Sequence, residues 1–247
     1  MKQIDLISLN IWGGFLTTPL LGFIKQHKDT DILCLQEVYH NAPKKMSTDD
    51  KSLPLDILDR IHKLLPDHEV YFLNSKDIKG YGIAIFIKKS FQVVDHGGIN
   101  AYHNASYPGS GPSHSRDLQW MKCQLDNISF YILNFHGLWN GKGKNDSDER
   151  ILQSEKIKNF LDQITDPYVL CGDFNLRPDT TSIKILESVA QNLIDQNGIT
   201  STRTRYYEKD EKYADYIFTS NNMKVQNFVV MKDEVSDHSP LYLSFTP

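Results

Sequence analysis

Polar and ionisable side chains in this sequence stand where short apolar segments end. Four segments finish in such a cluster, and further acidic and histidine positions follow near the C-terminal end. The clusters are Ser8-Leu9-Asn10, Gln36-Glu37-Val38, Asn134-Phe135-His136, Gly172-Asp173-Phe174-Asn175, Ala214-Asp215-Tyr216 and Ser236-Asp237-His238. Strand ends are rigid platforms for chemical groups, so their convergence would gather carboxylates, amides and imidazoles. That set suits a hard divalent cation such as Mg²⁺, which takes oxygen ligands from carboxylates, water and phosphate.

Each of these residues also has an ordinary structural explanation. An Asn or Asp after a strand is commonly a turn former, and Glu37 after an apolar run is commonly a surface residue. His136 alone is equally explained as a core histidine with satisfied hydrogen bonds. Asp237-His238 alone resembles a loop with a capping aspartate. The chemical interpretation therefore depends on the ordered set and not on any one member.

The clusters need strands to hold them, and the apolar pattern predicts strands along the whole chain. These are expected at residues 4–9, 32–35, 69–73, 82–87, 91–94, 118–125, 128–135, 168–171, 213–219, 225–231 and 241–245. Apolar spacing predicts helices over 20–28 and 56–65, from about Ser147, and from about Thr181. Asp146 is placed to cap the third helix, with Glu149 three residues further on, as in a capping box.

Hairpin-like neighbours outnumber strand–helix–strand units in this order of elements. We therefore expect an α/β (α+β) fold, with two packed mixed sheets and helices outside. Residues 97–115 are rich in Gly, Ser, Pro and His and are expected to form a long loop, a kind that is often functional. Because no repeat or linker interrupts the 247 residues, a single domain over 1–247 is expected.

Composition restricts the class of protein. A formal charge of −4 excludes a globally basic nucleic-acid binder, although it permits a local positive cleft. Cys34, Cys123 and Cys171 are odd in number, which indicates buried thiols in a reducing compartment and not a disulfide framework. No secretory signal is recognisable, and no apolar stretch reaches the roughly 20 residues of a membrane span. We expect a soluble, cytoplasmic monomer.

The motifs LNIWG, LQEV, NFHG, GDFN, ADYIF and SDH occur in this order from Ser8 to His238. This series resembles the endonuclease/exonuclease/phosphatase superfamily, which has the DNase I-like fold. GDFN and the terminal SDH are its most specific parts. The resemblance implies a four-layer sandwich and Mg²⁺-dependent hydrolysis of phosphate esters, with Mn²⁺ as a substitute ion.

The resemblance also implies a role for each matching residue. Glu37 would be the principal metal ligand with Asn10 beside it, and Asp237 would bind the metal directly or through water. Asp173 would orient or deprotonate the attacking water, and Asn175 would hold a phosphate oxygen.

The remaining motif residues would handle protons. His238 would contact the phosphate or act as the base, Asp215 would fix the tautomer of His238, and His136 would assist the leaving group. Whether Asp173 or His238 is the base stays open. Abasic-site endonucleases of the family carry a tyrosine at the place of His136 and an acidic residue at the place of Trp12, which puts that repair activity in doubt.

Cationic and aromatic residues outside the motifs are candidate substrate contacts, since Arg suits phosphate and aromatic rings stack on bases. The candidates are Arg116, Trp139, Lys142, Arg177 and Arg203. The alternative is that these are solvated loop residues. His96, His103 and His114 lack the cysteines or tight spacing of a zinc site.

These observations favour an intracellular nuclease or end-processing enzyme whose partner is nucleic acid or a nucleotide-containing phosphodiester. A phosphatase, or a phosphodiesterase of sphingomyelin or inositol phosphate, is the alternative with the same chemistry. A catalytically silent binding module is the second alternative, and the intact set of metal and histidine residues counts against it.

Overall fold

Twelve strands form two sheets in the computed structural model, which describes residues 2–43, 53–126 and 128–247. The first sheet contains β1 (Ile4–Asn10), β2 (Ile32–Tyr39), β3 (His68–Asn74), β4 (Tyr81–Lys88), β11 (Lys224–Val230) and β12 (Leu241–Thr246). The second contains β5 (Gln92–Tyr102), β6 (Arg116–Leu125), β7 (Ile128–His136), β8 (Tyr168–Asp173), β9 (Gln191–Asn192) and β10 (Asp215–Thr219). The helices are α1 (Thr17–Gln26), α2 (Ile57–Leu64), α3 (Asp148–Leu161), α4 (Thr181–Glu187) and α5 (Leu193–Gln196), and a 3-10 turn, η1, spans Trp12–Gly14.

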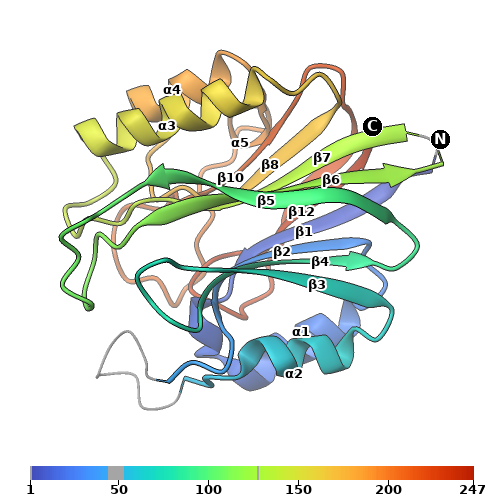
Figure 1. Ribbon diagram of the computed structural model, residues 1–247, viewed down its shortest axis with the longest axis horizontal. Coiled ribbons are helices and arrows are strands. Elements are labelled where there is room, and N and C mark those ends of the chain that lie inside the picture. The colour runs from blue at the N-terminus through green and yellow to red at the C-terminus, as the bar shows by residue number, and fades with distance from the viewer. Residues whose placement is uncertain (1, 44–52, 127) are drawn as a thin grey trace.

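The two sheets pack face to face, with α1 and α2 outside the first sheet and α3 and α4 outside the second (Figure 1). The strand orders are β11-β12-β1-β2-β4-β3 and β5-β6-β7-β8-β10-β9. Each sheet is mixed, because β1 runs parallel to β2 and β7 runs parallel to β8, while the other paired strands are antiparallel. The expected four-layer α/β sandwich is confirmed.

Both faces of the central strands are buried, which explains their continuous apolar sequences. In β1, Ile4 and Leu6 join the core between the two sheets. Ile7 and Leu9 join the second core, which packs against α1 and α2. Burial on both faces fixes the register of such a strand, because a shift by one residue would exchange its two apolar faces.

A chain of buried amides crosses from one sheet to the other beneath the polar strand ends. Gln36 of β2 donates from Nε2 to Oδ1 of Asn134 in β7 over 2.8 Å. Asn134 in turn donates from Nδ2 to the carbonyl oxygens of Leu35 and Ala84, each at 3.1 Å. Both side chains are fully buried. Since buried polar groups are stabilised only by such partners, these bonds fix how the sheets lie relative to each other.

The predicted loop over 97–115 is wrong in its first part. β5 continues to Tyr102 as the edge strand of the second sheet, pairing with β6. At Gly97 the missing side chain leaves room for the indole of Trp120, whose ring would lie 3.0 Å from a Cβ atom there. The glycine therefore marks a close packing contact inside a strand and not a loop. The loop itself occupies residues 103–115.

The predicted cap of α3 is also wrong. Ser147 is the N-cap residue and accepts from the backbone N–H of Arg150. Asp146 instead accepts from the backbone N–H groups of Thr181 and Ser182, at 2.7 and 3.0 Å. A carboxylate at a helix N-terminus satisfies free N–H groups, so Asp146 connects the start of α4 to the loop before α3.

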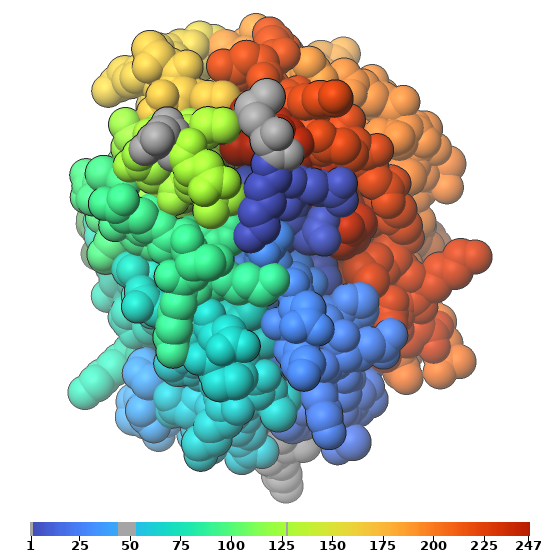
Figure 2. Space-filling view, turned by 90° about the vertical axis from the view of Figure 1, so that its right-hand side faces the viewer, coloured from blue at the N-terminus to red at the C-terminus, as the bar shows by residue number. Residues whose placement is uncertain are grey.

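The termini lie at one end of the molecule, and Figure 2 views that end with the N-terminal residues in blue beside C-terminal segments in red. β1 runs away from this end, so its last residue, Asn10, lies at the other end of the sheet. Cys34, Cys123 and Cys171 are free and buried, as expected. Within the described ranges, no helix is long and apolar enough to cross a membrane.

Replacing Asn134 tests the amide bridge. Asn134→Ala leaves the buried carbonyls of Leu35 and Ala84 and the amide of Gln36 without these bonds. We expect the free energy of unfolding to fall by about 2–4 kcal/mol in urea titrations followed by circular dichroism. Asn159→Ala, at an exposed position of α3, is the matched control and should change stability by less than about 0.5 kcal/mol. Equal stability of the two variants would contradict the bridging role.

Candidate active site

Strand pairing alone brings several of the polar clusters together. In the parallel pair β1–β2, Asn10 lies opposite Gln36. In the parallel pair β7–β8, His136 lies opposite Asp173, and in the neighbouring pair β8–β10 Asp173 lies opposite Asp215. Parallel strands end at the same edge of a sheet, so the ends of β1, β2, β7 and β8 meet at one end of the sandwich.

A bulge in β2 turns Glu37 toward this end. The pairing of β2 with β4 shifts register between Leu35 and Val38, and Glu37 has a φ of 58°. In a regular strand Gln36 and Glu37 would face opposite sides. The bulge instead lets Gln36 point between the sheets while Glu37 lies over the strand ends, a known use of bulges near functional sites.

The segment after β8 is shaped by one glycine. Gly172 has a φ of 140°, and a Cβ atom there would lie 1.9 Å from the carbonyl oxygen of Phe135. Only glycine allows β7 and β8 to approach this closely beside His136 and Asp173. The chain then turns, with Asn175 at a φ of 54° and its N–H donating to Oδ1 of Asp173 over 2.9 Å.

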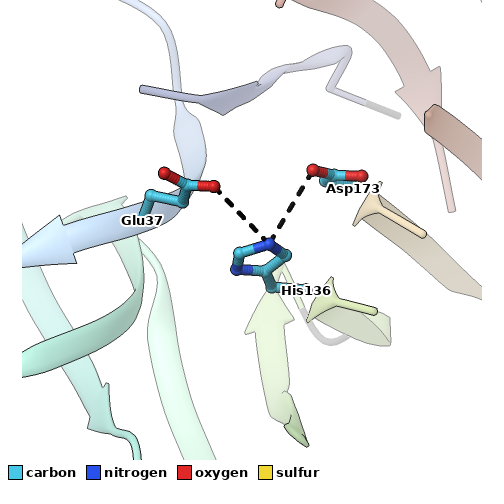
Figure 3. A group of neighbouring side chains, drawn as sticks. All are labelled: Glu37, His136 and Asp173. Carbon is cyan, nitrogen blue, oxygen red and sulfur yellow. Dashed lines mark ion pairs between the residues drawn. The ribbon is translucent and has the colours of Figure 1, made fainter. Parts of the chain in front are cut away.

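Glu37, His136 and Asp173 face one another, as Figure 3 shows. His136 Nε2 lies 3.7 Å from Glu37 Oε1 and 3.8 Å from Asp173 Oδ2. Asn10 connects the two carboxylates, because its Nδ2 donates to Glu37 Oε1 over 3.0 Å and to Asp173 Oδ2 over 2.9 Å. Side chains from four strands thus lie together, with Asn10 hydrogen-bonded to both carboxylates and His136 close to each of them.

A second group adjoins the first through Asp173. His238 Nδ1 donates to Asp215, with Oδ1 at 2.8 Å and Oδ2 at 2.9 Å. This bond fixes the tautomer in which Nε2 carries the lone pair, and Nε2 lies 3.6 Å from Asp173 Oδ2. Thr202 donates to Asp215 Oδ2 over 2.8 Å and holds the carboxylate in place.

Asp237 and two buried cations border these groups. Arg203 Nη1 lies 2.9 Å from Asp237 Oδ2, and its guanidinium lies 4.0 Å from the ring centroid of Tyr207. Lys144 is buried and donates from Nζ to the carbonyl of Tyr213 over 2.6 Å. Asp237 Oδ1 lies 3.8 Å from His238 Nε2, so the SDH segment contacts both groups.

Most of these residues open onto one cleft of about 370 Å³. Its lining includes most of the residues singled out from the sequence, namely Glu37, Arg116, His136, Trp139, Asp173, Asn175, Arg203, Asp237 and His238. Asn10 and Asp215 lie behind this lining and are fully or almost fully buried. Lys142 is exposed and Arg177 is partly exposed, both outside the cleft, and Arg177 pairs with Asp179 at 2.7 Å.

The cleft also contains residues that the motifs do not predict. Tyr81 begins the apolar strand β4, and nothing in its sequence surroundings marks it as a cleft residue. His114 belongs to the Gly- and Ser-rich loop, where its burial to 3% exposure could not be foreseen. Lys144 and Tyr207 were recognisable only as members of charged or aromatic loop segments.

Burial and neighbouring charges change the proton affinity of these groups. Burial, with the nearby carboxylates of Asp237 and Asp173, raises the pKa of Glu37 to about 7. Burial raises the pKa of Asp215 to about 6. Burial, with the charge of Arg203, lowers the pKa of His238 to about 3, so the imidazole is neutral near pH 7.

The donor set fits a divalent cation. Ligand atoms of Glu37, His136 and Asp173 all lie within 4.8 Å of one another. Burial and the nearby carboxylates of Asp237 and Asp173 raise the pKa of Glu37, and the hydrogen bond from the neutral amide of Asn10 does not offset them. Carboxylate and amide oxygens are the ligands that Mg²⁺ prefers. A cation at this position would relieve the repulsion among the carboxylates.

Solved structures share this fold. A mannosyl-6-phosphatase of Bacteroides thetaiotaomicron superposes with a TM-score of 0.75 at 19% identity, over 99% of this chain and 100% of that chain. An endonuclease/exonuclease/phosphatase of Bacteroides vulgatus gives a TM-score of 0.74 at 18% identity, over 100% and 99% of the two chains. D. rerio TDP2 complexed with single strand DNA product gives 0.73 at 15% identity, over 100% of each chain.

At these identities the similarity shows the fold alone. No protein among the curated sequences matches this chain. The sequence pattern of the Endonuclease/Exonuclease/phosphatase family, however, matches residues 7–238, a span that includes every motif segment from LNIWG to SDH. The chain therefore belongs to the endonuclease/exonuclease/phosphatase family, a family of metal-dependent phosphate ester hydrolases.

Proposed function

We propose that this protein is a Mg²⁺-dependent phosphodiesterase that acts on nucleic acid or on a nucleotide-containing ester. One observation carries the proposal. Carboxylates, a neutral His238 backed by Asp215, and buried cations are gathered at a single cleft. Hydrolysis of a phosphate ester needs these three elements, namely charge neutralisation, proton transfer and phosphate binding. We further propose that residues 1–247 work as one domain, as a cytoplasmic monomer.

Glu37 would hold the metal ion, with Mn²⁺ as a substitute. Asn10 would add a second ligand oxygen once its amide turns, because Nδ2 faces Glu37 while Oδ1 accepts from the N–H of Trp12. When bound, the ion neutralises negative charge on the nonbridging phosphate oxygens. Asp237 would assist directly or through water. Its bond to Arg203 at 2.9 Å supports an indirect role, because that bond already occupies one carboxylate oxygen.

Asp173 and His238 would position the attacking water. Their facing atoms, Oδ2 and Nε2, lie 3.6 Å apart, and both have lone pairs that accept a proton. Asp215 stabilises positive charge on His238 after such a transfer, as in any Asp–His pair. His136 lies on the other side of Asp173 and would stabilise the departing oxygen. Asn175 would donate to a phosphate oxygen.

The cations of the cleft would bind the substrate phosphate. Arg116, Lys144 and Arg203 line the cleft together with Trp139 and Tyr207, whose rings are suited to stack on a base. The single strand DNA product bound by D. rerio TDP2, a protein of the same fold, supports a nucleic-acid substrate. Lys142 and Arg177, which lie outside the cleft, would contribute little to binding.

A phosphatase is the second candidate. The cleft concentrates its cations at one place, while Arg177 and Arg205 are neutralised on the surface by Asp179 and Glu234. Cations gathered at one place can bind a single phosphate group as well as the phosphates of a polynucleotide. A mannosyl-6-phosphatase with the same fold supports this alternative.

A substrate panel separates these activities. With Mg²⁺ present, we expect cleavage of single-stranded DNA, RNA or a nucleotide ester, and a steep fall in rate with rising salt because cations contact the phosphates. Sphingomyelin, inositol phosphate and a phosphotyrosyl oligonucleotide complete the panel. Release of inorganic phosphate from simple monoesters alone would replace the nuclease proposal by the phosphatase. Inactivity toward every ester would contradict the proposed function.

Two substitutions test the catalytic groups. Glu37→Ala removes a carboxylate of the metal site and His238→Ala removes a proton acceptor. Each should lower kcat by about 10²-fold to 10⁴-fold while circular dichroism stays unchanged. Arg177→Ala is the matched control, because that side chain lies outside the cleft, and its rate should equal wild type. Activity close to wild type in either of the first two variants would refute the assigned chemistry.

The raised pKa of Glu37 makes metal binding depend on pH. Below about pH 7 the carboxyl of Glu37 holds a proton in the metal-free protein, and a neutral carboxyl is a poor metal ligand. Mg²⁺ affinity should therefore rise as pH increases from 5.5 to 7.5 and level off above, with protons released on binding. Isothermal titration calorimetry in two buffers of different ionisation enthalpy measures both quantities. In Glu37→Gln the affinity should be weak and much less dependent on pH.

A further inference from the structure

A small side pocket opens beside the cleft and contains two polar groups without partners. Its lining includes Asn74, Tyr81, Ile83, His114 and Arg116, and it shares Tyr81, His114, Arg116 and His136 with the main cleft. Its volume is about 30 Å³, enough for about two water-sized groups. The pocket can therefore hold a hydroxyl and its carbon, whereas a base or a sugar ring is too large.

Arg116 supplies unused hydrogen-bond donors. The residue is 5% exposed, and its Nε and Nη1 atoms have no hydrogen-bond partner among residues 2–43, 53–126 and 128–247. A guanidinium is rarely buried without partners, because removing a charge from water is costly. Two donors of a buried cation thus remain available to a ligand oxygen.

His114, which lines the same pocket as Arg116, supplies an unused acceptor. Its Nδ1 lies 2.9 Å from the carbonyl oxygen of Ser115, so Nδ1 must carry the proton and Nε2 the lone pair. Nε2 is buried and has no hydrogen-bond partner in the described part of the chain. A group that binds here must donate a hydrogen to His114 and accept one from Arg116.

The surrounding loop holds His114 in place before any ligand arrives. Asp77 accepts from the backbone N–H of Ser115 over 2.5 Å. Asn104 donates to the carbonyl of Ser113 over 2.8 Å, and Ser113 donates from its backbone to Trp139 over 2.8 Å. A preorganised pair of groups needs little ordering on binding, as expected of a specificity site.

We propose that Arg116 and His114 form a subsite for a hydroxyl group of the substrate, carried by the same carbon skeleton that is esterified to phosphate. A hydroxyl both donates and accepts, which a bare ester or an alkyl group cannot do. The substrate class is thus a phosphate ester of a polyhydroxylated compound, such as a ribose or another sugar. This inference rests on the phosphate ester chemistry proposed above. Among phosphate esters, it favours hydroxylated substrates over deoxyribose and phosphotyrosyl substrates.

Binding of a matched pair of ligands tests the subsite without turnover. Glycerol 3-phosphate and propyl phosphate share a three-carbon skeleton, and only the first has hydroxyls. In calorimetry with the full-length, Mg²⁺-loaded protein, glycerol 3-phosphate should bind about 10-fold to 100-fold more tightly, because it alone satisfies both buried groups. Equal affinities, or no binding of either ligand at millimolar concentration, would overturn the subsite.

Variants assign the effect to His114. In His114→Leu the affinity ratio of the two ligands should fall to near one, and His114→Gln, which keeps an acceptor oxygen, should retain part of it. His96→Leu, at an exposed position of β5, is the matched control and should keep the wild-type ratio. A wild-type ratio in His114→Leu contradicts the proposal. Should His114→Leu not fold, the wild-type protein and His114→Gln still decide it.

Two further pairs distinguish the source of the hydroxyl. Cleavage of RNA in preference to DNA of the same sequence would identify ribose. Tighter binding of glucose 6-phosphate than of cyclohexylmethyl phosphate would identify a free sugar phosphate. Lack of hydrolysis of every ester, together with a retained ligand ratio, would contradict the proposed function while supporting the subsite. Hydrolysis of an ester without any preference for hydroxylated ligands would support the proposed function and contradict the subsite.

Discussion

The hydrogen bond between Gln36 and Asn134 joins the two halves of the sandwich directly beneath the active site. Residues 98 positions apart in the chain meet in it. Glu37 follows Gln36 by one residue, and His136 follows Asn134 by two, so this bond fixes the separation of the carboxylate of Glu37 on one sheet from the imidazole of His136 on the other. The sheets have apolar inner faces that tolerate small displacements, whereas a buried amide pair has one good geometry.

The groups above this bond repel one another in the metal-free protein. Glu37 and Asp173 share the amide of Asn10, and Asp237 adds a third carboxylate nearby. Arg116 is buried without an ion partner on the described part of the chain. Such arrangements cost folding stability and persist because the surrounding strands are rigid. A cation between the carboxylates would relieve this repulsion, and a substrate oxygen beside Arg116 would give the guanidinium a partner.

Some parts of this site could be predicted from the sequence and others could not, and the physics of each part explains why. GDFN and LQE stand at ends of strands whose apolar runs are unmistakable, and SDH lies in the loop before the last apolar run, so the convergence of Glu37, Asp173 and His238 could be predicted. The bulge at Glu37 and the amide bridge could not, because both depend on pairing between distant strands. Gly97 and Gly98 resembled loop residues, since the Trp120 ring and the Leu73 side chain that pack on them lie far away in sequence. Asp146 was assigned to the wrong helix for the same reason.

The residues proposed for catalysis and those proposed for substrate recognition lie on different parts of the chain. Asn10, His136 and Asp173 end strands that the core holds from both sides. Trp139, Lys144, Arg203 and His114 lie in connecting segments, which can change without disturbing the sheets. Arg116 begins β6, where the rigid strand meets the loop before it, and its side chain lines the side pocket. On the proposed assignments, substrate preference could change through His114 and its loop while Asp173 and His238 keep their geometry, and His136, which also lines the side pocket, would be the one catalytic candidate in contact with both sets.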